Sequence, residues 1–439
     1  MITRRPCLTL SIRAFLVVLV GFIGAPSVAE DPLALSVGLH SSVTVEEEAK
    51  LIEELSAIGY VAGSELAGES SGVILREPER VSPGLNLMTS GHAPVALLMQ
   101  ADGTVVHEWR AEFDEIFADH PRSDRGHETR RNFWRDAILF PNGDIVVIWE
   151  LFGIFKLDRD SNVLWVVPEP AHHDLQLSEA EEIVHLQAER KMIAGIPEKQ
   201  AIEDFVVVRN AGGEEIRRVA LSDALSNVNW LKLRRTFWIR AEERAYGLDR
   251  RSAYDPFHTN SLQLLGASGA ALLGGRFQAG DALVSMGMLD TIAIIDLEKG
   301  ITRWSQQGPF GMQHSARLSP EGEIVLFNNF SSAKHSSIMT LDPRTRDVTR
   351  EYHGPDSKLL YSRRSGGVQL LPNGNMLITE TDGGRALEIA EDGDVVWEFH
   401  SPYRVEDEPD KVAHLYSLER IEESRAAWLY REAQAESGD

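Results

Sequence analysis

Short apolar stretches alternate with polar turns over most of this 439-residue chain. Near the C-terminus, a Pro-Asn-Gly-Asn turn at 372–375 separates two apolar stretches, and an acidic turn at 391–394 separates two more, the last ending in Trp397. Asn-Gly and Asp-Gly between apolar stretches favour tight hairpins, because these residues tolerate a positive φ. The pattern therefore predicts four antiparallel strands in this part of the chain.

The same order of strands and turns recurs along the chain, as in proteins built from internal repeats. Complete copies lie at 138–165 and 316–352, and three partial copies bring the number of units to six. Six units of about 40 to 50 residues are typical of a β-propeller, in which each four-stranded blade packs against its neighbours. One internal order throughout favours this fold over a β-sandwich. The partial copies are 97–109, 174–219 and 261–304.

We therefore expect an all-β fold, with a six-bladed β-propeller at 89–400 and short helical N- and C-terminal flanks. Apolar residues at helical spacing predict a helix at 44–58, within an N-terminal flank and linker at 30–88. Similar spacing predicts a helix at 412–433, within a C-terminal tail at 401–439. Both flanks are expected to pack beside the propeller or to be solvated.

The first 29 residues have the pattern of a secretory signal peptide. Arg4 and Arg5 precede an apolar run at 14–24, and a Ser-Val-Ala triplet of cleavage type ends at Ala29. The run is shorter than the roughly 20 residues that cross a membrane as a helix, so only an uncleaved signal would anchor the protein. We expect the protein to be exported, to the periplasm or to the cell exterior.

Acidic residues outnumber basic ones, 67 to 44, which gives a formal net charge of -23. A strongly acidic surface repels phosphate backbones, so nucleic acid is not an expected partner. An anionic substrate would need a local positive site to offset this charge. The single cysteine, Cys7, lies in the expected signal peptide, so the mature protein would contain no disulfide and no cysteine metal ligand. The sequence does not indicate an oligomeric state.

When the repeats are aligned on their turns, one position at the start of each first strand is mostly polar. First strands usually line the channel of a propeller, so equivalent positions should form a ring at one height. His258 should point the same way, because it lies two residues before a ring position. A single buried histidine is more often structural than functional, but several at one height favour a functional site. The ring positions are Arg135, His173, Asn260, His314 and Gly366.

Three short motifs resemble the arylsulfotransferase family, in particular its bacterial exported branch with propellers rich in Pro-Asn-Gly turns. They are His-His-Asp at 172–174, His-Thr-Asn-Ser at 258–261 and Gln-His at 313–314, and the whole resemblance covers roughly residues 90 to 400. Pro-Asn-Gly turns are common to propellers, whereas these motifs in this order are more specific. The resemblance implies a transferase that uses no cofactor and no metal ion.

The resemblance implies that His314 is the nucleophile, which takes a sulfuryl group from a phenolic sulfate ester and passes it to another phenol. A neutral imidazole is nucleophilic near neutral pH, and a sulfohistidine intermediate lets one pocket serve donor and acceptor in turn. The resemblance assigns supporting catalytic roles to His258 and to one of His172 and His173. Only one of that pair should point inward, because side chains alternate along a strand.

One segment departs from the family pattern, which has an arginine in a Ser-x-Arg sequence. The matching segment here is Ser-Met-Gly, so Gly287 replaces the arginine. Loss of one donor to a developing oxyanion lowers rates on the order of 10² to 10³, so the sequence predicts a loss of activity unless another cation takes its place. We hypothesise that Arg135 does so and that Asn260 also binds substrate, because both occupy ring positions, whereas Arg317 and Arg276 are less suitably placed.

Three functions remain open at this point. The first is sulfuryl transfer between small aromatic or sulfated molecules. The second is a non-catalytic propeller that binds a ligand or a partner, because a fold does not determine a function. The third is a divalent metal site formed by channel histidines. Aromatic residues at 133–134 and Phe310 favour an apolar or aromatic ligand without identifying it.

Overall fold

The structure is a computed structural model, and it describes residues 63–118, 132–178, 180–194, 196, 201–229, 255–332, 335–355 and 358–430. By its contacts the chain divides into residues 1–44 and 45–439, and every described residue belongs to the second unit. The predicted signal peptide and the predicted helix at 44–58 lie outside the described residues. None of the described helices is long and apolar enough to cross a membrane.

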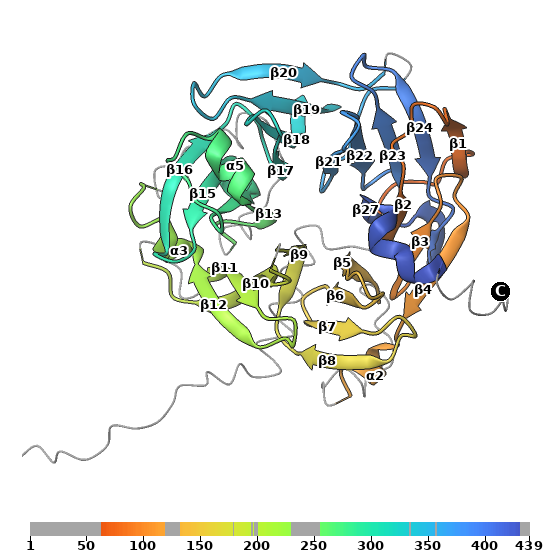
Figure 1. The fold of residues 1–439 in the computed structure, drawn as a ribbon, viewed down its shortest axis with the longest axis horizontal. Coiled ribbons are helices and arrows are strands. Elements are labelled where there is room, and N and C mark those ends of the chain that lie inside the picture. The colour runs from red at the N-terminus through yellow and green to blue at the C-terminus, as the bar shows by residue number, and fades with distance from the viewer. Residues whose placement is uncertain are drawn as a thin grey trace, which may run out of the picture. The chain divides into compact units, whose positions relative to one another are not determined.

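Six antiparallel sheets are arranged around a central channel, which confirms the predicted all-β, six-bladed propeller (Figure 1). In blades two to five, four strands follow in chain order from the channel to the rim. Blades two and three contain β5 (Trp134–Leu139), β6 (Ile145–Trp149), β7 (Gly153–Leu157) and β8 (Val163–Val167), then β9 (Ala171–Leu177), β10 (Ile183–Lys191), β11 (Ala201–Arg209) and β12 (Glu215–Ala220). Blades four and five contain β13 (Thr259–Leu264), β14 (Ala282–Met286), β15 (Thr291–Asp296) and β16 (Ile301–Gln307), then β17 (His314–Leu318), β18 (Ile324–Ser332), β19 (His335–Leu341) and β20 (Val348–Tyr352).

Blades one and six contain strands from both ends of the described chain. Blade six gains β1 at its rim, beside β24, and blade one has β27 at its channel position, beside β2. The strands of blade six are β21 (Gly367–Leu370), β22 (Met376–Glu380), β23 (Arg385–Ile389), β24 (Val395–His400) and β1 (Gly72–Arg76). Those of blade one are β27 (Leu415–Ile421), β2 (Leu85–Ser90), β3 (Val95–Met99) and β4 (Val105–Arg110).

Short elements connect or flank the blades. The hairpin of β25 and β26 links blade six to β27 along the chain, and the short helices lie between strands or after the last one. These elements are β25 (Arg404–Val405), β26 (Glu408–Val412), α2 (Phe113–Ile116), α3 (Leu221–Ala224), α5 (Ala267–Leu272), η4 (Gly287–Leu289) and η5 (Glu423–Ala426).

The prediction of a helix at 412–433 is wrong for Leu415–Ile421, which pair with β2 along their whole length as β27. Without β27, the inner edge of β2 would leave its N–H and C=O groups unpaired in the channel, and this favours a strand over a helix. Helical structure begins only at η5, after the strand ends. The propeller therefore extends beyond the predicted limits of 89–400 at both ends.

The turns of the three clearest repeats have the predicted geometry. Gly143, Gly322 and Gly374 have φ values of +92°, +79° and +87°. At Gly143, a Cβ atom would also lie only 2.9 Å from ring atoms of Trp428. The aromatic residue at the end of blade one, Trp109, donates from Nε1 to Gly143 O at 3.2 Å and so joins blade one to blade two.

Side chains one residue after the predicted ring positions tie neighbouring blades together. Each accepts a hydrogen bond from the backbone N–H that lies two residues after the ring position of the next blade. Recurrence of one contact holds the inner strands of blades two to six at one height, and it confirms the predicted register. The pairs are Asp136 with Leu175 at 3.1 Å, Asp174 with Leu262 at 2.8 Å, Ser261 with Ala316 at 3.1 Å and Ser315 with Val368 at 3.0 Å.

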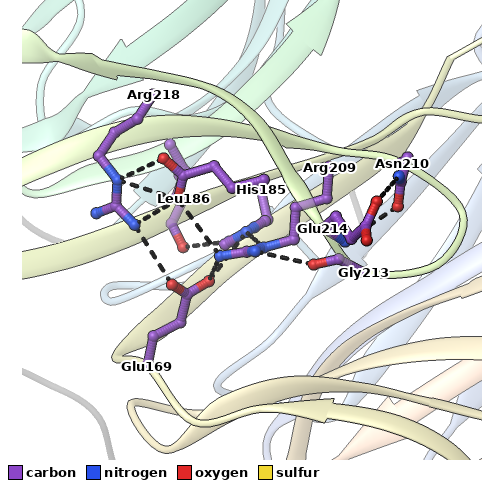
Figure 2. A network of polar contacts seen from close by, with 9 residues as sticks. Glu169, His185, Leu186, Arg209, Asn210, Gly213, Glu214 and Arg218 are labelled. Carbon is purple, nitrogen blue, oxygen red and sulfur yellow. Dashed lines mark hydrogen bonds and ion pairs between the residues drawn. The ribbon is translucent and has the colours of Figure 1, made fainter.

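Blade three contains a network of charged side chains (Figure 2). Arg209 on β11 donates from Nε to His185 Nε2 at 3.1 Å and forms an ion pair with Glu169. His185 on β10 is fully buried and donates from Nδ1 to Leu186 O at 3.2 Å, so it is neutral. Burial and the charge of Arg209 lower the pKa of His185 to about 3. The network thus fixes the two middle strands of the blade that carries His172 and His173.

Replacement of Arg209 by methionine should lower the free energy of unfolding by about 3 kcal/mol, because it leaves the largely buried Glu169 without its main partner. This is the low end of the usual cost, since Arg218 also lies 3.5 Å from Glu169. Urea denaturation measures the change. The control is Arg217→Met, at an exposed position of β12, which should change stability by less than about 0.5 kcal/mol. Equal stability of the two variants would contradict this account of the network.

Candidate functional site

The channel contains a cavity of about 610 Å³ that is bordered by the inner strands of all six blades. At one end the ring is almost closed to solvent, with exposed fractions of 2% for His314 and 8% for His173. At the other end the cavity is lined by α5, where Leu272 is 42% exposed. All five predicted ring residues line this cavity: Arg135, His173, Asn260, His314 and Gly366.

His314, the first residue of β17, is held through one ring nitrogen. Its Nδ1 lies 2.9 Å from Met312 O and 2.9 Å from Asn329 Oδ1. Asn329 presents its oxygen to the ring because its amide nitrogen donates to Ser362 O and Ser365 O, at 2.8 and 2.9 Å. Two acceptors at Nδ1 require the proton there, so Nε2 carries the lone pair. This Nε2 is buried and has no hydrogen-bond partner among the described residues.

The charge state of His314 also suits a nucleophile. Burial, together with the positive charges of His258 and Arg135, lowers the pKa of His314 to about 3. The imidazole is therefore neutral at physiological pH, and its lone pair is available for bond formation.

The choice between His172 and His173 is decided by a bulge in β9. The pairing with β10 shifts at His173, whose φ is +60°, so side chains no longer alternate along this strand. His173 lines the cavity, whereas His172 lies behind it, with the two Nδ1 atoms 2.8 Å apart and His172 Nε2 3.6 Å from Asp204 Oδ1. Burial and the charge of Arg135 hold the pKa of His173 well below its usual range.

His258 lies beside His173, with their ring centroids 5.1 Å apart, but it is not on the cavity wall. Its Nδ1 lies 2.6 Å from Asp255 Oδ2, and its backbone N–H donates to Asp255 Oδ1 at 2.9 Å. Burial opposes the protonation of His258, but the charge and the hydrogen bond of Asp255 outweigh it and raise the pKa above its ordinary value. The site thus combines two neutral histidines with one that favours a positive charge.

Arg135 on β5 brings a guanidinium group to the cavity wall. Its Cζ lies 4.2 Å from the centroid of the Tyr416 ring, its Nη2 donates to Ser365 Oγ at 3.3 Å, and its Nε lies 3.5 Å from Glu150 Oε2. The side chain of Glu150 is fully buried. A cation–π contact, a hydrogen bond and an ion pair therefore fix the position of this cation.

Sequence reasoning missed Tyr416, which contacts Arg135 and lines the cavity from β27. Alignment on turns could not find it, because β27 pairs with β2 and no hairpin joins the two strands. Asp255, the partner of His258, was also missed, although the Asp-x-x-His spacing is readable in the sequence.

Neither Arg317 nor Arg276 occupies a ring position. Arg317 Nη2 donates to Asp174 Oδ2 at 3.1 Å, and Arg276 is exposed and does not line the cavity. Within the part of the chain that the structure describes, no three His, Cys, Asp or Glu side chains are placed to hold a metal ion. A metal site of channel histidines therefore has no ligand set in that part.

The family model for arylsulfotransferase (ASST) matches residues 136–402, which is more than half of the chain. The chain belongs to the arylsulfotransferase family. This confirms the resemblance carried by the three histidine motifs, and at the level of the family it makes the chain transferase-like. No curated protein matches the sequence.

Solved structures similar to this arylsulfotransferase family member match it at low sequence identity and with TM-scores below 0.5. A protein of unknown function from Bacteroides caccae is 15% identical, with a TM-score of 0.46, and the match covers 72% of this chain and 94% of that one. Virginiamycin B lyase from Staphylococcus aureus is 12% identical, with a TM-score of 0.36, and the match covers 61% of this chain and 70% of that one. The WD40 propeller domain of Doa1 is 12% identical, with a TM-score of 0.42, and the match covers 79% of this chain and 88% of that one. Likenesses this weak decide nothing about activity.

Gly287, where the resemblance leads us to expect an arginine, has no open space for a side chain. A Cβ atom at Gly287 would lie 2.9 Å from Asn260 Nδ2 and 3.5 Å from His258 O. Asn260 Nδ2 in turn donates to Gln313 O at 2.9 Å, next to His314. A long side chain at Gly287 would therefore disturb the ring, and the guanidinium at a ring position belongs to Arg135 in blade two.

The contribution of His314 to stability should be lost progressively as the pH falls below about 6.5, the ordinary pKa of histidine. In the unfolded chain His314 takes up a proton near its usual value of 6.5, whereas in the fold it stays neutral down to about 3. The unfolded state then binds more protons, so the free energy of unfolding decreases with decreasing pH across this window.

We expect His314→Asn to remove part of this dependence. Between about pH 6.5 and 5, the parent protein should lose up to about 2 kcal/mol more than the variant in urea denaturation. The matched control is His353→Asn, because the side chain of His353 is 47% exposed and lies outside the cavity. Parallel pH curves for the parent and the His314 variant would show that burial does not keep His314 neutral.

Proposed function

We propose that this protein transfers a sulfuryl group from an aryl sulfate to a phenol, through a sulfohistidine at His314. One observation carries the proposal. Hydrogen bonds from Nδ1 to Met312 O and Asn329 Oδ1 leave the lone pair on Nε2 of a neutral histidine that lines the cavity. A neutral, oriented imidazole is the form in which histidine attacks an electrophile.

In the first half-reaction, the Nε2 lone pair attacks the sulfur of the donor. The N–S bond forms as the bond from sulfur to the aryl oxygen breaks, and the aryloxide leaves with the bonding electrons and takes a proton from solvent. The proton stays on Nδ1, where Met312 O and Asn329 Oδ1 accept its hydrogen bonds, so the imidazolium ring is cationic and balances the negative charge of the bound sulfonate. A cationic nitrogen is a good leaving group for the step that follows.

In the second half-reaction, the oxygen of an acceptor phenol attacks the sulfur. The new S–O bond forms as the N–S bond breaks, and the electron pair returns to Nε2 of His314. His173 is the residue that we propose takes up the phenolic proton before it passes to solvent. It lines the cavity, its ring centroid lies 6.4 Å from that of His314, and its lowered pKa keeps it neutral.

Negative charge on the sulfuryl oxygens requires cations and donors around the group in flight. Arg135 is the proposed cation on the wall, and His258 adds positive charge from behind His173. Asn260 is the proposed contact for the phenolic hydroxyl, because its Oδ1 has no hydrogen-bond partner among the described residues. Together these groups would supply the local positive site that an anionic substrate needs in a protein with a net charge of -23.

The proposed ligand is a small aromatic or sulfated molecule. Leucines farther along the cavity support this, since Leu264, Leu318 and Leu370 line it four residues after ring positions. We also propose that the protein acts after export, on the basis of the signal-like pattern of its first 29 residues.

Incubation with 4-nitrophenyl sulfate should add the mass of one SO₃ group to the peptide that contains His314, with release of 4-nitrophenol. His314→Gln should abolish both signals, because the nucleophile is lost. His353→Gln, in an exposed position after the last strand of the same blade, should retain both. Phenol release with no adduct on this peptide would place the nucleophile elsewhere, and neither signal in the parent protein would favour a binding function.

Arg135→Ala should lower the rate of 4-nitrophenol release on the order of 10² to 10³, as expected for loss of one group that stabilises a developing oxyanion. The control is Arg364→Ala, whose exposed side chain lies on the segment that precedes Ser365. That variant should keep the parent rate. Parent activity in Arg135→Ala would remove Arg135 from the mechanism.

A further inference from the structure

The cavity is elongated, and an aryl group bound beside the ring can lie along it toward α5. It extends without interruption from the ring to α5, and exposure of its lining rises from 2% at His314 to 42% at Leu272. If the sulfuryl group of a substrate lies beside His314, its aromatic group lies along the inner strands. There it contacts the residues that come after the ring positions. The walls of that section decide which aromatic groups fit.

Three carboxyl groups and one guanidinium line this section of the cavity: Asp136, Asp174, Glu419 and Arg317. Two of the carboxyl groups are used within the protein. Asp136 accepts backbone hydrogen bonds from Leu175 and from its own neighbour Ala137, at 3.1 and 2.9 Å. Asp174 accepts from Leu262 at 2.8 Å and pairs with Arg317 at 3.1 Å.

Glu419 on β27 is the third carboxyl group, and it takes part in none of these contacts. No hydrogen bond or ion pair joins its side chain to any residue that the structure describes, although Arg317 and Arg425 act on it electrostatically. A partly buried carboxylate without a partner is costly unless a ligand or solvent compensates it. Burial raises the pKa of Glu419, and a cation bound beside it would favour the ionised form.

The position of Glu419 matches the length of a substituted phenol. It lies three residues after Tyr416 on one strand, which is about 10 Å along the cavity from the ring. A phenyl ring with a two-carbon ammonium arm in the para position spans a similar length from its phenolic oxygen. The ring of such a molecule would lie at the level of Val368 and Leu418, which line the cavity two residues after Gly366 and Tyr416.

We propose that Glu419 is a specificity-determining residue that selects acceptor phenols carrying a cationic amine. The inference rests on the proposed function, because it assumes that the sulfuryl group is held beside His314. Neutral phenols are weaker acceptors, since they form no charge-assisted hydrogen bond with Glu419. Phenols with a para-linked carboxylate are the poorest, because like charges repel in a cavity of low dielectric.

The test compares three acceptors of similar size with 4-nitrophenyl sulfate as donor: 4-(2-aminoethyl)phenol, 4-propylphenol and 3-(4-hydroxyphenyl)propanoate. The parent protein should prefer the amine over the neutral phenol by about tenfold in kcat/KM, the effect of one hydrogen bond to a charged group. Glu419→Gln keeps the size of the side chain and removes its charge. It should lose this preference, change the neutral phenol by less than about twofold and improve the carboxylate.

Glu422→Gln is the matched control, because Glu422 follows β27 at an exposed position outside the cavity. It should retain the order of the three acceptors. An unchanged order in Glu419→Gln would overturn the role of Glu419, and so would a parent protein that does not prefer the amine. This parent ranking tests the proposal even if the variant does not fold.

The two levels of inference fail differently. An adduct on His314 with no preference for the amine would overturn the specificity and leave sulfuryl transfer intact. No adduct and no sulfated product with any acceptor would overturn both.

Discussion

The hydrogen bond that recurs between neighbouring inner strands is the contact on which the site depends. Each joins a side chain next to a ring position to a backbone N–H of the following blade, as Asp174 does with Leu262. Because this contact fixes the relative height of adjacent blades, side chains from different blades meet at one level of the channel. These contacts are made by side chains other than the histidines.

Burial at that level produces the chemical state of the site. The protein has a net charge of -23, yet Arg135 and the raised pKa of His258 concentrate positive charge at the closed end of the cavity. The same burial and the same cations lower the pKa of His314 and of His173. Neutral histidines beside a fixed cation are what a nucleophile needs when its substrate is an anion.

The arrangement also bears on Gly287, where the resemblance leads us to expect an arginine. Gly287 packs against Asn260 and His258, so there is no room for an arginine without displacing the ring. A guanidinium reaches the cavity from a different blade, where Tyr416 and Glu150 hold it. Tyr416 lies on β27, the strand that closes the propeller, and Glu419 on the same strand lines the cavity farther from the ring. Closure of the ring and construction of the site therefore depend on the same segment.

The sequence by itself determined the number of blades, the positive-φ turns and the common register of Arg135, His173, Asn260, His314 and Gly366. These features follow from local chemistry, because a hairpin turn and the alternation of apolar residues are encoded within a few neighbouring positions. The motifs around three of the histidines were also sufficient to identify the family.

Only the tertiary structure decided the features whose partners are distant in the chain. β27 is a strand because β2 offers it an unpaired edge, and this brings Tyr416 and Glu419 to the cavity. His173 faces inward because a bulge in β9 interrupts the alternation that the sequence implies. The tautomer of His314 depends on Asn329, which is oriented in turn by backbone carbonyls of the loop before blade six. In each case the deciding energy comes from a contact between segments that only folding brings together.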